Sequence, residues 1–227
     1  MGAAPTWANA CVGDNGVPGM VDYAEGFASA ANALLDSAIA NQGMELTVDT
    51  LVYPVCFTMR HAIELFLKKV TADLAHIGVV RGAPLPAFDL VASHDLDRIW
   101  AYMKTHAPAT DERLADLVSK LDEYVTDVAD MDATGQVFRY PFDLRNKKHL
   151  TSIGVINFVI LKRRFNEIQQ LLEELNRTAG DLVEEYSWGT CTKSLSRLQI
   201  RRIAAELPLK AKWGEAVFDH VRSEERR

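Results

Sequence analysis

The stretch from Asp49 to Leu74 constrains the fold of this chain more than any other. Apolar residues recur in it at spacings of three and four, which places them on one continuous arc of an α-helix. These residues are Leu51, Val52, Val55, Met59, Ile63, Phe66, Val70 and Leu74. A helix with such an arc is buried along one whole side, so we expect it to be the central helix of an all-α domain.

The other side of the same helix mixes aromatic and ionic side chains: Tyr53, Phe57, Arg60, Glu64 and Lys68. The three charged residues form a ladder at i, i+4 steps, which ordinarily stabilises an exposed helix face by about 0.2–0.5 kcal/mol per pair. A solvated face has no need of two aromatic rings among its charges. We therefore predict that this helix makes contacts on both sides, which is also compatible with a dimer.

The length and composition of the chain indicate its domain organisation and its cellular environment. With 227 residues, of which 48% are hydrophobic, the chain can form one domain with a sizeable core and an appendage. Its three cysteines are far apart and odd in number, without metal or disulfide spacing, which fits a reducing cytosol. The N-terminus lacks a signal-peptide pattern, and the most apolar run, residues 153–161, is too short to span a bilayer. We expect a cytoplasmic protein without membrane contact, metal or cofactor.

The charge is unevenly distributed along the chain. The net charge of −6 argues against a surface coated uniformly for nucleic acid. However, residues 137–164 contain seven basic residues and one acidic residue, and residues 191–227 contain nine basic residues and five acidic residues. One face of the protein could hold an anionic ligand, or solvated helix faces could simply alternate in sign.

Periodicity and turn residues predict the order of elements. A loose arm of residues 1–20 precedes a helical domain of residues 21–186, and a C-terminal extension of residues 190–227 follows it. The predicted helices span 21–41, 49–74 (capped by Thr47 or Asp49 and closed by Gly78), 95–107 (ending before Pro108), 111–131 and 151–186. Residues 132–150 break the helical period and predict an extended segment or hairpin near 133–145. The extension predicts a pair of helices separated by Pro208.

Three of these segments together resemble the HEPN superfamily: RHAIELFLKK in the central helix, HDLDRIW after a loop, and GQVFRYPFD before the next long helix. The resemblance covers about residues 20–178. It implies a small antiparallel all-α bundle, a homodimer, and a prokaryotic defence or toxin–antitoxin context with an operon-encoded protein partner. Many members of that superfamily are metal-independent endoribonucleases, and others are RNA-binding or assembly modules without activity.

The ribonuclease motif of that superfamily places a His a few residues after an Arg and a polar residue. The nearest match is Arg145-Asn146-Lys147-Lys148-His149, one residue shorter than the usual spacing. On a helix, Arg145 and His149 would share a face. The imidazole would then act as general acid or base while the guanidinium stabilises the charged transition state. Alternatively, residues 143–148 form a charged turn and His149 is an exposed residue before the next helix.

A second hypothesis concerns ligand binding at the central helix. In it, Arg60 is partly buried, oriented by Glu64, and meets either the Arg139-Tyr140-Pro141 segment or Asp143, beside rings that suit a nucleotide base. His94 joins this candidate set because it lies at the start of a helix. In the alternative, Arg60 and Glu64 are a structural ion ladder and His94 is a cap or loop contact.

Three functions follow, in order of preference. The first is an RNA- or nucleotide-binding or interaction module, the second an endoribonuclease using Arg145 and His149, and the third a structural dimerisation or partner-docking domain. The C-terminal helices favour a docking or dimer contact over a DNA-reading helix-turn-helix, because their turn lacks the expected glycine.

Overall fold

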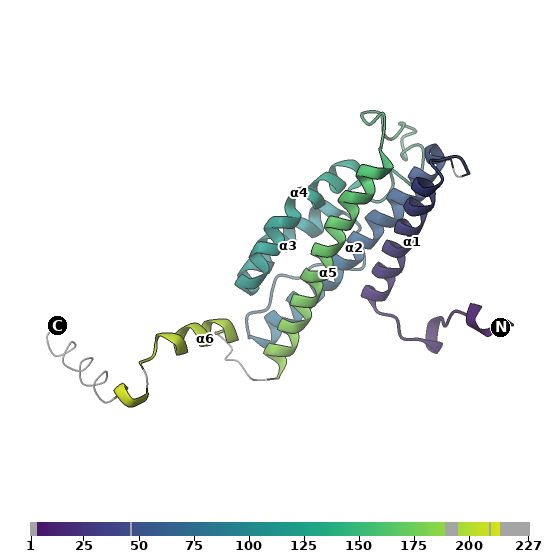
Figure 1. Ribbon diagram of the computed structural model, residues 1–227. Coiled ribbons are helices and arrows are strands. Elements are labelled where there is room, and N and C mark those ends of the chain that lie inside the picture. The colour runs from purple at the N-terminus through teal and green to yellow at the C-terminus, as the bar shows by residue number, and fades with distance from the viewer. Residues whose placement is uncertain (1–3, 46, 189–194, 209, 214–227) are drawn as a thin grey trace.

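The computed structural model describes residues 4–45, 47–188, 195–208 and 210–213, and it is an all-α bundle (Figure 1). Its helices are α1 (Met20–Ala40), α2 (Val48–Val80), α3 (Leu96–Thr110), α4 (Ala115–Asp132), α5 (Phe158–Ser187) and α6 (Arg197–Glu206). Short 3-10 helices span Thr6–Ala8, Gly13–Asn15, Glu112–Leu114 and Lys210–Lys212. The predicted all-α fold is confirmed.

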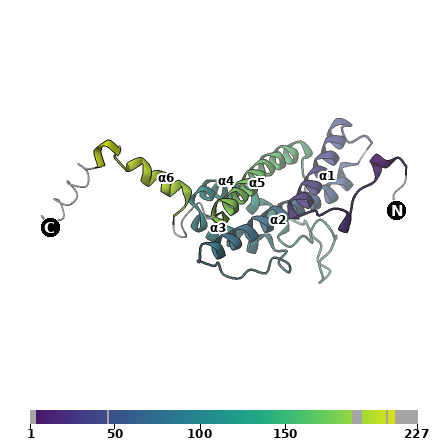
Figure 2. The same ribbon diagram turned by 90° about the horizontal axis from the view of Figure 1, so that it is seen from below.

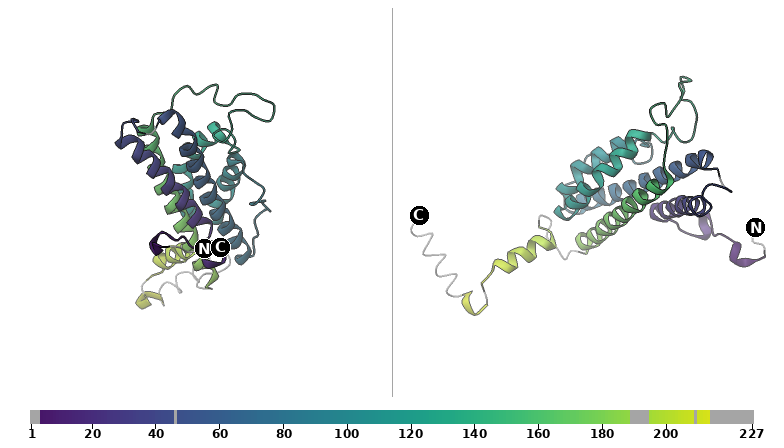
Figure 3. Two further views of the ribbon diagram at one scale, coloured as in Figure 1. Left: turned by 90° about the vertical axis from the view of Figure 1, so that its right-hand side faces the viewer. Right: turned by 45° about the horizontal axis from the view of Figure 1, so that its top comes forward.

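α2 is the central helix, as the two-sided pattern predicted. It packs against α1, α3, α4 and α5 (Figure 3). Its apolar arc is buried, and so are the small residues of α1 that face it, Ala24, Ala28 and Ala31. The alanines let the two helix backbones approach closely, and the long apolar side chains of α2 fill the remaining space.

Three predicted helix limits differ from the structure. α2 continues past Gly78, which is needed for another reason: a Cβ there would lie 2.9 Å from the carbonyl oxygen of Ala83. α3 continues through Pro108, which lies in its last turn and removes one intrahelical N–H bond there, instead of ending before it. α5 begins at Phe158 rather than near 151, because the side chain of Asn157 caps it by accepting from the N–H groups of Val159 and Ile160.

Arg60 of α2 and Arg81, the residue that caps the C-terminus of α2, bind the carbonyl groups that end α4 and α3. Arg60 donates from Nε to the oxygen of Asp132, at 3.1 Å, and from Nη2 to that of Ala133, at 2.7 Å. Arg81 donates to the oxygen of Thr110. The last carbonyls of a helix lack partners within it and carry partial negative charge, so cations stabilise them. α2 is thereby fastened to the α3–α4 pair at two levels.

The two ends of the described chain leave the bundle on opposite sides (Figures 1 and 2). α6 buries none of its residues and is held mainly at its base, where the Arg197 N–H donates to Glu185 at 2.9 Å and Arg202 pairs with Glu112 at 2.8 Å. Of the second predicted C-terminal helix, residues from 214 onward lie outside the described part. Within that part, no helix has the length and apolarity needed to cross a bilayer.

Candidate functional site

The ionic ladder of α2 is a buried cluster centred on Glu64. Arg60, Glu64 and Lys68 are 3%, 1% and 5% exposed. The Glu64 carboxylate accepts from Arg60, from Lys68 Nζ at 2.8 Å, and lies 2.8 Å from His94 Nδ1. Burial alone raises the pKa of Glu64, but its contacts with His61, Lys68 and His94 and the charge of Arg60 outweigh it and hold the pKa well below its usual range.

Arg60 does not meet the segment that the sequence suggested. It is fully buried rather than partly buried, and its three nitrogens bind Glu64 and the carbonyl oxygens of Asp132, Ala133 and His94. Gly135, at φ +74°, lies against the guanidinium, since a Cβ there would be 3.1 Å from Nη1. The contact between Arg60 and Glu64 follows the predicted i, i+4 pairing, whereas the contacts of both residues with His94 were not predicted. The group they form joins α2 to the ends of α4 and of the loop before α3.

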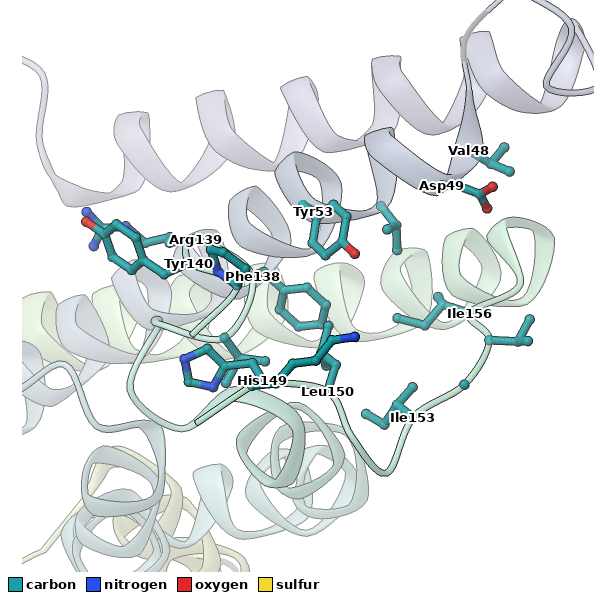
Figure 4. A pocket seen from close by; sticks show the side chains of 16 residues that line it. Val48, Asp49, Tyr53, Phe138, Arg139, Tyr140, His149, Leu150, Ile153 and Ile156 are labelled. Carbon is teal, nitrogen blue, oxygen red and sulfur yellow. The ribbon is translucent and has the colours of Figure 1, made fainter. Parts of the chain in front are cut away.

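A cavity of about 720 Å³ lies beside this cluster, between the first turns of α2 and the segment that joins α4 to α5 (Figure 4). Its lining comprises Val48, Asp49, Val52, Tyr53, Val137, Phe138, Arg139, Tyr140, Pro141, Lys148, His149, Leu150, Ile153, Gly154, Val155 and Ile156. Arg139, Tyr140 and His149 are among the residues that sequence reasoning selected. Arg60, Glu64, His94, Asp143 and Arg145 do not line it.

The segment around Arg145 is a tight turn and not a helix. Asp143 accepts hydrogen bonds at 2.8 Å from the N–H groups of Arg145 and Lys147, which lower the pKa of its carboxyl group. Phe142 and Lys148 form an isolated antiparallel bridge that closes the turn. Arg145 is therefore exposed at the tip, while His149 lies at the base against the cavity. The helical i, i+4 arrangement of Arg145 and His149 does not form.

The aromatic side chains of α2 belong to a column of rings that reaches the cavity. Phe27 meets His61 edge-on at 4.6 Å, and His61 stacks on Phe57 at 5.9 Å between ring centres. The guanidinium of Arg139 lies 5.4 Å from the ring centre of Phe57 and 5.4 Å from that of Tyr140. These contacts explain why the second face of α2 carries aromatic residues, and they hold Arg139 by cation–π attraction.

Polar groups of the cavity lack partners within the described chain. His149 Nε2 is buried and makes no hydrogen bond. The carboxylate of Asp49 and the ammonium of Lys148, which both line the cavity, form no ion pair with the described residues. Arg164, by contrast, lies near the start of α5 and forms ion pairs with Glu123 and Asp127. Buried polar atoms in proteins are nearly always hydrogen-bonded. The buried, unpartnered imidazole nitrogen of His149 is therefore a sign of a polar ligand, whereas Asp49 and Lys148 are exposed to solvent and could contact such a ligand from the rim.

Sequence reasoning missed Asp49 and Lys148 as lining residues and gave Tyr53 only a supporting role. Asp49 was considered a helix cap, whereas Thr47 occupies the cap position of α2 without a side-chain hydrogen bond. The available signal for Tyr53 was its place on the mixed face of α2. Lys148 belongs to the basic segment of residues 137–164, but only the turn at Asp143 brings it to the lining of the cavity.

No protein-family model matches the chain, and the comparisons with curated proteins and with solved structures find no match. The resemblance to the HEPN superfamily therefore stays a prediction based on the three segments that carry it. Across the described residues, no three His, Cys, Asp or Glu side chains are grouped so that they could hold a metal ion.

Proposed function

We propose that this protein binds a nucleotide or a single-stranded stretch of RNA in the cavity between α2 and residues 137–156. The supporting observation is that unpaired cations, an unpartnered buried imidazole nitrogen and aromatic rings line the same hollow. Arg, Lys and His⁺ donate strong hydrogen bonds to phosphate, and unstacked bases pack on aromatic rings. At about 720 Å³ the cavity is of the size that small-molecule sites have.

Five of the lining residues have a defined role in this proposal. Arg139 and Lys148 neutralise phosphate, and His149 Nε2 makes one directed hydrogen bond to it. Tyr53 and Tyr140, both about half exposed, offer ring faces to a base. In the context that the HEPN resemblance implies, the protein is a binding module of a prokaryotic defence or toxin–antitoxin system, working as a homodimer or with an operon-encoded partner.

The endoribonuclease alternative receives less support from the geometry. It needs Arg145 and His149 at one reacting phosphate, and Arg145 is exposed at the tip of the turn while His149 lines the cavity. Binding without cleavage is therefore the first proposal.

Fluorescence anisotropy with an end-labelled single-stranded RNA tests it. Arg139→Ala should weaken binding about tenfold, which corresponds to the loss of about 1.4 kcal/mol. Arg145→Ala is the matched control, because it removes the same charge from the exposed turn and should change the affinity less than twofold. Equal loss in both variants would show that only diffuse charge attracts the RNA.

The same mixtures, run on a denaturing gel, decide between binding and catalysis. Intact RNA is the expected result. Cleavage that both His149→Ala and Arg145→Ala abolish would establish the ribonuclease instead. A chain that forms a stable dimer in light scattering and neither binds nor cleaves RNA would support the structural role.

A further inference from the structure

The charges of the cavity are separated along α2. Asp49, Tyr53 and Phe57 follow one another at i, i+4 steps, so they lie on one face at successive turns of the helix. Arg139 lies over Phe57, two turns from Asp49, or about 12 Å along the helix axis. Figure 4 shows the same order, with Asp49 at one end of the cavity, Arg139, Tyr140 and His149 at the other, and Tyr53 between them.

A ligand that fits this order has an anionic group at one end and hydrogen-bond donors at the other. The cationic end requires negative charge, as in a phosphate. At the opposite end, the Asp49 carboxylate can only accept hydrogen bonds, and it makes none with the described residues. Between the two, the ring of Tyr53 suits a flat, unsaturated group. A nucleotide has all three parts, in this order.

The carboxylate also distinguishes between bases. Guanine carries two adjacent donors on its pairing edge, N1–H and the N2 amino group, which match the two oxygens of a carboxylate. Adenine and cytosine place a ring nitrogen acceptor next to their amino group, and uracil flanks its single N–H with two carbonyl oxygens. A carboxylate facing any of these three bases meets an acceptor, which is repulsive.

Resting on the function proposed above, we infer that the cavity prefers guanine nucleotides, or a guanine base within single-stranded RNA. Asp49 accepts from N1–H and the N2 amino group, Tyr53 packs on the purine ring, and Arg139 with His149 holds the phosphate. The distance along α2 from Asp49 to the level of Arg139 is comparable with that from the pairing edge of a purine nucleotide to its phosphate.

Calorimetric titration of the full chain with GMP, IMP and AMP tests this preference. GMP should bind about tenfold more tightly than AMP, since a bidentate contact to a base edge discriminates against the wrong base by about fivefold to 150-fold. IMP keeps N1–H and lacks the amino group, so it should bind with intermediate affinity. These three titrations need no variant and do not depend on how a substitution folds.

Substitutions then test whether Asp49 is the residue that determines the preference for GMP. Asp49→Asn replaces one acceptor by a donor and should raise the dissociation constant for GMP to that for AMP. Asp97→Asn is the matched control, because Asp97 is also an exposed residue in the first turn of a helix, α3, and does not line the cavity. It should leave the preference for GMP unchanged.

The outcomes separate the inference from the proposed function. If GMP and AMP bind equally and Arg139→Ala weakens both, the nucleotide site stands and the guanine preference is wrong. A preference for GMP that persists in Asp49→Asn removes Asp49 from the recognition of the base. If none of the three nucleotides and no RNA binds the wild-type chain, both proposals fail together.

Discussion

Glu64 shows at the scale of one residue how a polar group is kept inside a helical bundle. Its two oxygens face Arg60, Lys68 and His94, so the carboxylate is surrounded by donors and has no access to solvent. Moving charges out of water is costly, and only a complete set of partners offsets that cost. The sequence pattern of Arg60, Glu64 and Lys68 is typical of an exposed helix face, but in the structure these residues are part of the protein interior.

Glu64→Gln should lower the free energy of unfolding by about 3–5 kcal/mol, because it leaves Arg60 and Lys68 buried without a counter-charge. Urea denaturation followed by circular dichroism measures the change. Asp97→Asn, at an exposed position in the first turn of α3, should cost no more than about 0.3–1 kcal/mol, which is the contribution of one charge at a helix N-terminus. A loss below about 1 kcal/mol in Glu64→Gln would mean that water reaches the cluster and solvates these cations.

The same carboxylate makes stability depend on pH. Its pKa in the folded protein lies below the unfolded value of about 4.3, so its contribution is complete above that pH and is lost as the pH falls further. Between about pH 5 and pH 3, wild-type stability should therefore decline more steeply than that of Glu64→Gln. Urea titrations at a series of pH values measure the free energy of unfolding of both proteins. If it declines equally with pH in wild type and Glu64→Gln, other carboxylates dominate acid unfolding.

Cys56 should be inert in the folded protein. Burial raises the pKa of its thiol to about 12, and the nearby charge of Asp132 adds to this, so the reactive thiolate is absent at neutral pH. Exposed Cys11 should be alkylated by iodoacetamide, while Cys56 is modified only after unfolding. Peptide mass spectrometry distinguishes the two. Equal rates at both positions would mean that the first half of α2 opens readily.

At the scale of elements, the sequence was most informative where one helix carries its own pattern. The arcs of α2 predicted its central place and its contacts on two sides, because both follow from the 3.6-residue period. The carbonyl partners of Arg60 could not be predicted, since they lie 34, 72 and 73 residues away and depend on where α4 ends. The start of α5 was placed too early because residues 153–156 are apolar, although they line the cavity instead of continuing a helix.

A substitution at Gly135 tests the contact between Arg60 of α2 and the C-terminal end of α4. Gly135→Ala should destabilise the protein by more than Gly82→Ala, although both glycines have left-handed backbones, with φ +74° and +70°. The shared conformational cost is about 1–2 kcal/mol. Only at position 135 would the added Cβ press on Arg60, whereas position 82 has open space around it. Equal losses in thermal unfolding would show that the guanidinium moves aside without cost.

At the scale of the whole molecule, half of the candidate site was within reach of sequence reasoning. Arg139, Tyr140 and His149 were selected, from a basic segment and from a motif. The sequence also suggested that the segment around Arg139 lies beside the rings of α2. That His149 and Asp49 line the same cavity could not be foreseen, because the segment of residues 137–156 has no period and its course depends on the turn at Asp143 and the cap at Asn157. Such turns depend on single side chains, and their direction is set by the elements they connect.

The cavity has a consequence for how the chain assembles. One wall comes from the first turns of α2 and the other from residues that join α4 to α5, nearly 90 positions later. Pairs of neighbouring helices, α1 with α2 and α3 with α4, close short loops and form early, while α5 must bridge a long loop to reach α2. In stopped-flow refolding, binding of a fluorescent nucleotide should therefore lag behind the recovery of helical signal. If nucleotide binding and the helical signal recover in one phase, the bundle folds in a single step, and the cavity forms together with the core.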